Sequence, residues 1–139
     1  MRKQFSNQEI LSYAQQLSKV ILNAAEDIEL PVRVNFYLQK NIKTFLKAAQ
    51  EINEMRLKIG KKYGEYDKET QSYQIQDKNK LELAQQDLKN LLSIDQILDI
   101  YMISLTDIED LKLTVAEMNA MLFMIDENDN EQIIYIDEE

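Results

Sequence analysis

The chain has 139 residues and contains no histidine and no cysteine, which excludes much of the familiar catalytic machinery. Ser-His and Cys-His nucleophile pairs and the usual zinc ligand sets need those residue types, so carboxylates, lysine, arginine and tyrosine remain for chemistry. Hydrophobic residues make up 45% and charged residues 29% of the chain, and glycine and proline total three. This composition favours one folded, mainly helical domain over a disordered chain or a turn-rich β fold.

The net charge of −9 is unevenly distributed along the chain. Residues 1–62 contain 11 Lys and Arg against 6 Asp and Glu, whereas residues 63–139 contain 5 against 19. The sequence shows neither the apolar region of a signal peptide nor an apolar run of about 20 residues, the length that spans a membrane. We therefore expect a cytoplasmic protein without a membrane segment.

The first predicted element is a helix over residues 7–26. Ser6 and Glu9 have the spacing of a capping box, and apolar residues recur at helical intervals from Leu11 onward. A short acidic connection then leads to Pro31, and the residue before a proline is disfavoured in helical geometry. The sequence therefore predicts an elbow between Leu30 and Pro31.

The strongest signal is one long helix over residues 31–63. Pro31 suits a first helical turn because it has no backbone donor to lose and its ring fixes a helical φ, and Gly60 and Gly64 come where a stop is expected. Its main apolar residues lie three or four positions apart, close to a coiled-coil seam. They are Leu38, Ile42, Phe45, Ala49, Ile52, Ile59 and Tyr63.

Arg56 interrupts that seam at a position where an apolar residue is expected. Four further apolar residues, Val34, Leu46, Met55 and Leu57, widen the apolar stripe. A stripe this wide predicts burial against more than one element rather than a two-stranded zipper.

Shorter elements follow the long helix. Residues 64–70 are typical of a polar turn, residues 72–76 of a short strand, and Asp77 can cap a third helix. Residues 94–105 combine a capping-box pattern with the β-branched and aromatic content of a strand, and we favour a strand over residues 97–103. Residues 106–109 could begin a short helical turn. Thr114 and Glu117 form another capping box, which predicts a last helix from Val115 to about Met124.

Four basic residues of the long helix are candidates for partner binding: Arg33, Lys40, Lys43 and Lys47. The three lysines share one helix face and could contact phosphates or an acidic protein surface. The alternative is a solvated face neutralised by the chain's own acidic half. The acidic overall balance is unlike that of most nucleic-acid binders, which disfavours that partner.

Tyr63 and Tyr66 are two further candidates, because tyrosines are enriched at interfaces, although they are equally normal at the boundary of a small core. The methionines of the last helix are interpreted as core residues. The acidic sequence from Asp126 to Glu131 superficially suggests calcium, but the glycine and the bidentate glutamate of an EF-hand are not in register. No catalytic residue, metal ligand or cofactor site is assigned.

The layout of the chain also carries a resemblance. The segments LPVRVNFYLQKNIKTF, KKYGEYD, SYQIQD and LTVAEMNAMLFMID follow one another between residues 30 and 125. In this order the chain resembles small uncharacterised helix-rich proteins of tailed phages and prophages of Gram-positive bacteria. The resemblance implies an accessory or host-interaction protein and supplies no catalytic residues.

Taken together, the sequence predicts a mainly α fold with minor β structure, in which a helical bundle or hairpin is built on one long helix. Residues 1–125 form one helical domain, and residues 126–139 form an acidic tail that either frays or adds an edge strand at residues 133–136. The leading functional hypothesis is a non-enzymatic protein–protein interaction protein, with a protein partner or self-association. Nucleic-acid binding through the basic face and a carboxylate-dependent metalloenzyme are the alternatives.

Overall fold

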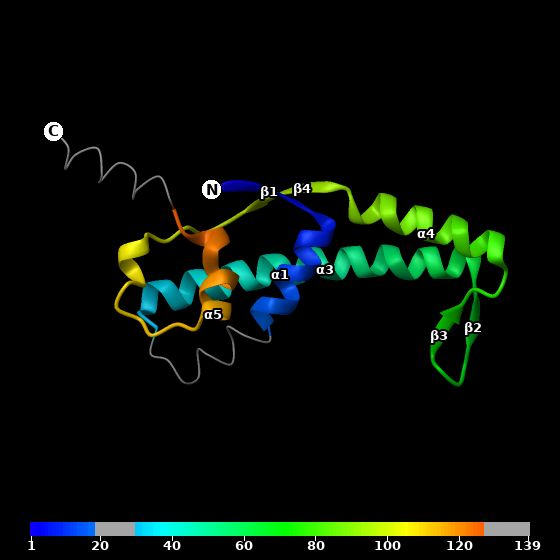
Figure 1. Ribbon diagram of the computed structural model, residues 1–139, viewed down its shortest axis with the longest axis horizontal. Coiled ribbons are helices and arrows are strands. Elements are labelled where there is room, and N and C mark those ends of the chain that lie inside the picture. The colour runs from blue at the N-terminus through cyan, green and yellow to red at the C-terminus, as the bar shows by residue number, and fades with distance from the viewer. Residues whose placement is uncertain (19–29, 127–139) are drawn as a thin grey trace.

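The long predicted helix is the axis of the molecule (Figure 1). The computed structural model describes residues 1–18 and 30–126. Helix α3 spans Val32–Tyr63, with Pro31 as the extended residue before it. It runs through Gly60 and ends at Gly64, whose N–H donates to the carbonyl oxygen of Gly60 at 2.8 Å. The prediction is confirmed, with the start of the helix moved by one residue.

The chain before α3 forms a strand and a helix. Strand β1 (Arg2–Ser6) leads directly into α1 (Asn7–Gln16), and the capping box of Ser6 and Glu9 is confirmed. Residues 19–26 of the predicted helix lie outside the described residues. β1 carries no strand signal in its sequence; it forms because it pairs antiparallel with β4 (Asp95–Asp99), placing Arg2 opposite Asp99.

Strand β4 begins before the predicted span of residues 97–103 and ends within it, because β1 pairs only as far as Asp99. Beyond it the chain leaves the sheet, and Ile103 forms an isolated parallel bridge with Ile125. The second sheet is a hairpin of β2 (Glu65–Asp67) and β3 (Ser72–Gln74). The prediction of a polar turn over residues 64–70 is therefore wrong for the β2 residues. They form a strand because they pair with β3, and the paired Tyr66 and Tyr73 rings lie 5.4 Å apart.

Helix α4 (Lys78–Leu92) returns along α3 and is capped by Asp77, as predicted. A 3-10 turn, η2 (Leu105–Asp107), precedes α5 (Val115–Met121), which begins with the predicted capping box of Thr114 and Glu117. α5 ends before the predicted Met124 because its last residues tighten into the 3-10 turn η3 (Leu122–Met124). Within residues 1–18 and 30–126, no helix is long and apolar enough to cross a membrane.

The core is centred on a group of aromatic rings from three parts of the chain. The centre of the Phe45 ring of α3 lies 5.2 Å from the ring centre of Phe5, 5.1 Å from that of Phe123 and 5.4 Å from that of Tyr13. Burial, and secondarily the Glu9 carboxylate, raise the pKa of Tyr13 above its usual value. Met121 and Met124 are buried, as expected for core residues.

The buried residues of α3 end at Ile52, which divides the described structure into two regions. We call residues 53–88 the arm: the last turns of α3, the β2–β3 hairpin and most of α4. The other described residues form the body, which contains most of the core. Four residues were expected to widen the buried apolar stripe of α3, and of these four Val34 is buried. Leu46, Met55 and Leu57 are exposed, Leu57 at the side of α3 that faces the arm's groove described below.

Candidate functional site

The structure separates the candidate partner-binding residues into two places. Arg33, Lys40, Lys43 and Lys47 lie on the part of α3 that belongs to the body, and all four are exposed. Tyr63 and Tyr66 lie in the arm, at the end of α3 and on β2. From Lys47 to Tyr63 the helix rises about 24 Å, so the six residues do not form one site.

The basic residues of the body stand beside aromatic rings. The guanidinium of Arg33 lies 5.3 Å from the centre of the Tyr37 ring, and the amine of Lys40 lies 5.4 Å from that of Phe36. Tyr37 also packs against Tyr101, with ring centres 5.1 Å apart. These cation-π contacts alternate charged groups and aromatic rings along α3. We call Arg33, Phe36, Tyr37 and Lys40, with Lys43 and Lys47 beside them, the basic strip.

A buried asparagine fixes one edge of this strip. The side chain of Asn41 donates to the carbonyl oxygen of Tyr101 at 2.9 Å and accepts from its N–H at 2.8 Å. Because both backbone groups of Tyr101 are engaged, the chain two residues beyond β4 is held against α3. Sequence reasoning missed Asn41, although a polar residue between Leu38 and Ile42 on the apolar side of the helix is a visible signal.

Tyr63 joins the two helices of the arm. Its hydroxyl donates to the Asp87 carboxylate of α4 at 2.7 Å, and Lys62 lies 3.6 Å from the same carboxylate. The neighbouring Tyr63 and then the charge of Asp87 raise the pKa of Lys62, which favours its charged form. Tyr63 therefore has a structural contact in the arm, while Tyr66 is more than half exposed on the hairpin.

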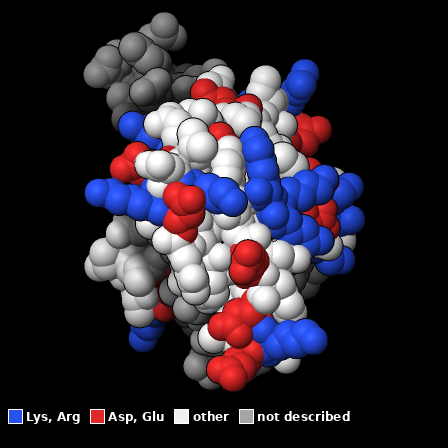
Figure 2. Space-filling view, turned by 90° about the vertical axis from the view of Figure 1, so that its right-hand side faces the viewer, with Lys and Arg blue, Asp and Glu red and all other residues white. Residues whose placement is uncertain are grey.

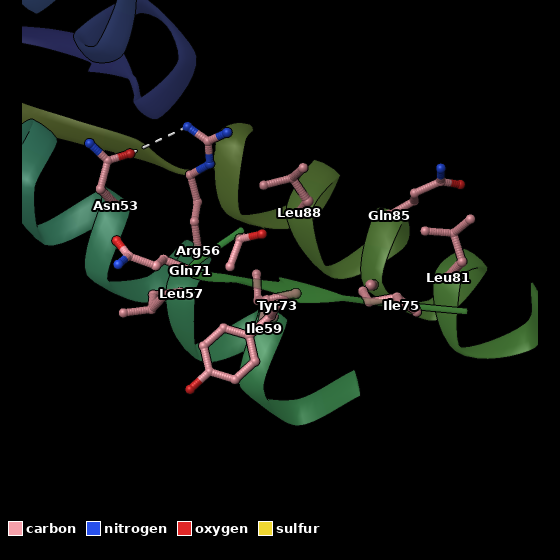
Figure 3. A pocket seen from close by; sticks show the side chains of 13 residues that line it. Asn53, Arg56, Leu57, Ile59, Gln71, Tyr73, Ile75, Leu81, Gln85 and Leu88 are labelled. Carbon is pink, nitrogen blue, oxygen red and sulfur yellow. Dashed lines mark hydrogen bonds between the residues drawn. The ribbon is translucent and has the colours of Figure 1, made fainter. Parts of the chain in front are cut away.

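A groove of about 500 Å³ runs along the arm between α3, α4 and the hairpin (Figure 3). Asn53, Arg56 and Leu57 extend from α3, and Leu81, Gln85 and Leu88 extend from α4. Tyr73 and Ile75 lie between the two helices. The groove is thus lined mainly by apolar side chains contributed by three separate elements.

The apolar lining is incompletely covered. Leu57 is 52% exposed and Leu81 is 39% exposed, although each lies at helical spacing from buried or partly buried neighbours. Together with Ile59, Tyr73 and Leu88, these side chains give the groove an apolar lining that another apolar segment could cover. The groove is the part of the arm where the apolar stripe of α3 has no covering element among the described residues.

Among the described residues, Arg56 is the one charged residue that lines the groove. Its guanidinium donates to the side-chain oxygen of Asn53 at 3.3 Å, which directs it across the rim. This site was not predicted from the sequence, although the interruption of the apolar seam by Arg56 is a signal that could have indicated it. Arg56 marks the point along α3 where core packing ends and the groove begins.

Positive charge also gathers at the free end of the arm. Figure 2 looks at this end and shows a band of Lys and Arg side chains across it, interrupted by a few acidic residues. Lys61 and Lys62 lie in the last turn of α3, and Lys78 and Lys80 begin α4. A ligand that enters the groove from this end would meet a basic rim.

The described residues contain no group of three or more His, Cys, Asp or Glu side chains that could hold a metal ion. Apart from Asp126, the acidic sequence that superficially suggests calcium lies outside them. Comparison of the chain with protein-family models, with curated proteins and with solved structures finds no match.

Proposed function

We propose that this protein is a non-enzymatic protein-interaction protein whose arm binds an apolar segment of another protein. The observation that carries the proposal is the groove between α3, α4 and the hairpin, with its exposed Leu57 and Leu81. Binding another segment there would remove these side chains from water. At about 25 cal/mol per Å² of apolar surface removed from water, that burial favours association.

The lining of the groove suits recognition better than chemistry. It offers apolar side chains, the amides of Asn53, Gln71 and Gln85, and one guanidinium, with no carboxylate among the lining residues. General acid–base catalysis needs two suited titratable groups placed on the same substrate, and the lining offers the Tyr73 phenol and the Arg56 guanidinium without a carboxylate or a histidine beside them. The alternative of a carboxylate-dependent metalloenzyme has no supporting cluster within the described residues.

We place this activity in the cytoplasm; within the described residues no helix could cross a membrane, which agrees with that placement. The layout resemblance to phage and prophage proteins supports an accessory or host-interaction role. The partner is then a protein of the host cell or of the virion.

A photo-crosslinking amino acid at position 85 tests the proposal in the cells that produce the protein, because Gln85 lies on the groove and is exposed. We expect adducts of discrete mass that disappear when Leu81→Asp is introduced. The matched control carries the same amino acid in place of Gln50, which is exposed on α3 outside the groove. Equal adducts from both positions, or none from position 85, would contradict the proposal.

A second candidate function is binding of single-stranded nucleic acid by the strip on the body. Its support is the placement of Arg33 and Lys40 against aromatic rings beside Lys43 and Lys47, since bases stack on aromatic side chains while cations contact phosphates. A labelled oligonucleotide titrated at about 50 mM salt, where phosphate contacts are strong, should lose affinity with Lys43→Gln and Lys47→Gln. Lys89→Gln, on α4, is the control. Undetectable binding at that salt concentration would remove this candidate.

A further inference from the structure

The chemistry of the groove indicates what kind of segment it binds. We propose that its occupant is an acidic amphipathic helix of a different protein, one apolar face of which enters the groove while a carboxylate reaches Arg56. This inference rests on the proposed function and adds the shape and charge of the partner.

The shape of the groove fits a helix. The lining residues of α3 fall between Asn53 and Gly60, and those of α4 fall between Leu81 and Leu88, so each helix contributes one face over about two turns. Two helices packed side by side leave a groove that a third helix fills, as in helical bundles. An amphipathic helix would present residues three and four positions apart along that groove.

The charge of the groove selects the sign of the partner. Between residues 53 and 63, α3 carries Arg56, Lys58, Lys61 and Lys62 against the single acidic residue Glu54. Over the whole arm, residues 53–88, seven basic residues balance seven acidic ones, and Lys62 is already paired with Asp87, so the charge that faces the groove is that of Arg56. A second copy would bring another Arg56 to this surface, and like charges would oppose a symmetric dimer through the groove. An acidic helix would instead bring an opposite charge to Arg56.

Burial of Arg56 would strengthen the preference of the groove for an acidic helix. Arg56 is exposed now, and a helix that covered the groove would remove its guanidinium from water. A buried charge without a partner is costly, whereas a carboxylate can accept two hydrogen bonds from an arginine at once. A neutral or basic helix would leave Arg56 unpaired, and an acidic helix would not.

Two matched synthetic peptides test the proposal against the full chain. Both form an amphipathic helix with the same leucine face, and their remaining positions carry glutamate in one and glutamine in the other. By fluorescence anisotropy at low salt, the glutamate peptide should bind about tenfold more tightly, equivalent to about 1.4 kcal/mol. A proline in the middle of the glutamate peptide should abolish binding, because it breaks the helix. Equal affinities of the two peptides, or unchanged binding of the proline peptide, would overturn the proposal.

Variants of the protein locate the effect. Arg56→Gln should reduce the preference for the glutamate peptide to less than about twofold, while Leu81→Asp should remove binding of both peptides. Lys47→Gln removes one positive charge from α3 outside the groove and should leave the preference unchanged. A preference that responds to Lys47→Gln and not to Arg56→Gln would show general charge attraction and overturn the proposal.

Two other occupants are distinguishable outcomes. A concentration-dependent dimer in sedimentation equilibrium that Leu81→Asp dissociates would assign the groove to a second copy. A tenfold gain in peptide affinity with Ile134→Ser and Tyr135→Ser in the full chain would assign it to the chain's own C-terminal sequence. Either result would overturn this inference. Crosslinked partners without an acidic preference would overturn it and leave the proposed function standing, whereas absence of any groove crosslink would remove the function itself.

Discussion

The body and the arm share α3, yet they bury it to very different extents. From Val34 to Ile52 the helix contributes eight buried residues, and from residue 53 to Tyr63 it contributes none. In the body, α1 and the aromatic residues Phe5 and Phe123 pack against α3. In the arm, the main described elements that pack against α3 are α4 and the small hairpin. The difference shows that one amphipathic helix can close a core at one end and leave an apolar surface open at the other, depending on how many elements return to it.

Truncation of a core ring gives the sharpest contrast between the two regions. Phe45→Ala should lower the free energy of unfolding by about 3–5 kcal/mol, because Phe45 is fully buried among other rings. Leu57→Ala in the arm should cost less than about 1 kcal/mol, because that side chain is already half exposed. Urea denaturation of both variants measures the difference. Similar losses would mean that the arm is packed as tightly as the body.

Substitution of Asn41 tests how much its hydrogen bonds to Tyr101 stabilise the body beside the basic strip. Asn41→Leu keeps the branched shape of the side chain but removes both hydrogen bonds to the backbone of Tyr101, at an expected cost of about 1–3 kcal/mol. Asn35→Ala, at an exposed position on the same helix, should change stability by no more than about 0.5 kcal/mol. If the two variants had the same midpoint of urea unfolding, the hydrogen bonds between Asn41 and Tyr101 would contribute nothing to the free energy of unfolding.

The end of the arm can be disturbed separately through its two glycines. A Cβ at Gly64 would lie 2.9 Å from the carbonyl oxygens of Gln74 and Gly60, so Gly64→Ala should cost about 1–3 kcal/mol. A Cβ at Gly60 would meet the Cβ of Tyr73 at 3.2 Å, a milder contact that is offset by a gain of about 0.5–1 kcal/mol for alanine within a helix.

Hydrogen exchange should show faster exchange in the hairpin and the end of α3 for Gly64→Ala, with the body unchanged. Gly60→Ala should leave exchange rates close to those of the parent protein. Faster exchange throughout the body in Gly64→Ala would show that the two regions unfold as one unit, which would break the distinction between them.

The smallest expected effect comes from the contact between α3 and α4. Tyr63→Phe removes the hydrogen bond to Asp87 and should destabilise the arm by about 0.5–1.5 kcal/mol. Tyr66→Phe, on the exposed hairpin, serves as the matched control and should be nearly neutral. Exchange rates of the α4 amides report the difference, and equal rates in both variants would exclude a stabilising role for Tyr63.

Local sequence signals predicted the helices well. Pro31, the capping boxes at Ser6 and Thr114, and the cap at Asp77 each act over three or four residues, so their effect is visible without the fold. The strand β1 could not be found in this way. Its sequence has no alternating pattern, and it forms through pairing with β4, which lies about ninety residues away in the chain.

The candidate site was only partly visible for the same reason. Leu57 and Leu81 lie 24 positions apart, and an apolar residue at helical spacing ordinarily indicates burial. Whether it is buried depends on how many elements return to cover it, which is a property of the whole topology. Arg56 is the local sequence feature at the point where core packing along α3 ends. The predicted basic residues and the predicted tyrosines lie on separate surfaces.

The continuity of α3 has a mechanical consequence. No proline interrupts the helix after residue 31, and the chain passes from the body into the arm without a break in helical hydrogen bonding. The α3 wall of the groove is therefore a direct continuation of the helix that the body buries, and it is already helical before any ligand binds. A segment bound there would lose little free energy to reorganising the protein. The bound segment would also lie at a set distance along α3 from the basic strip.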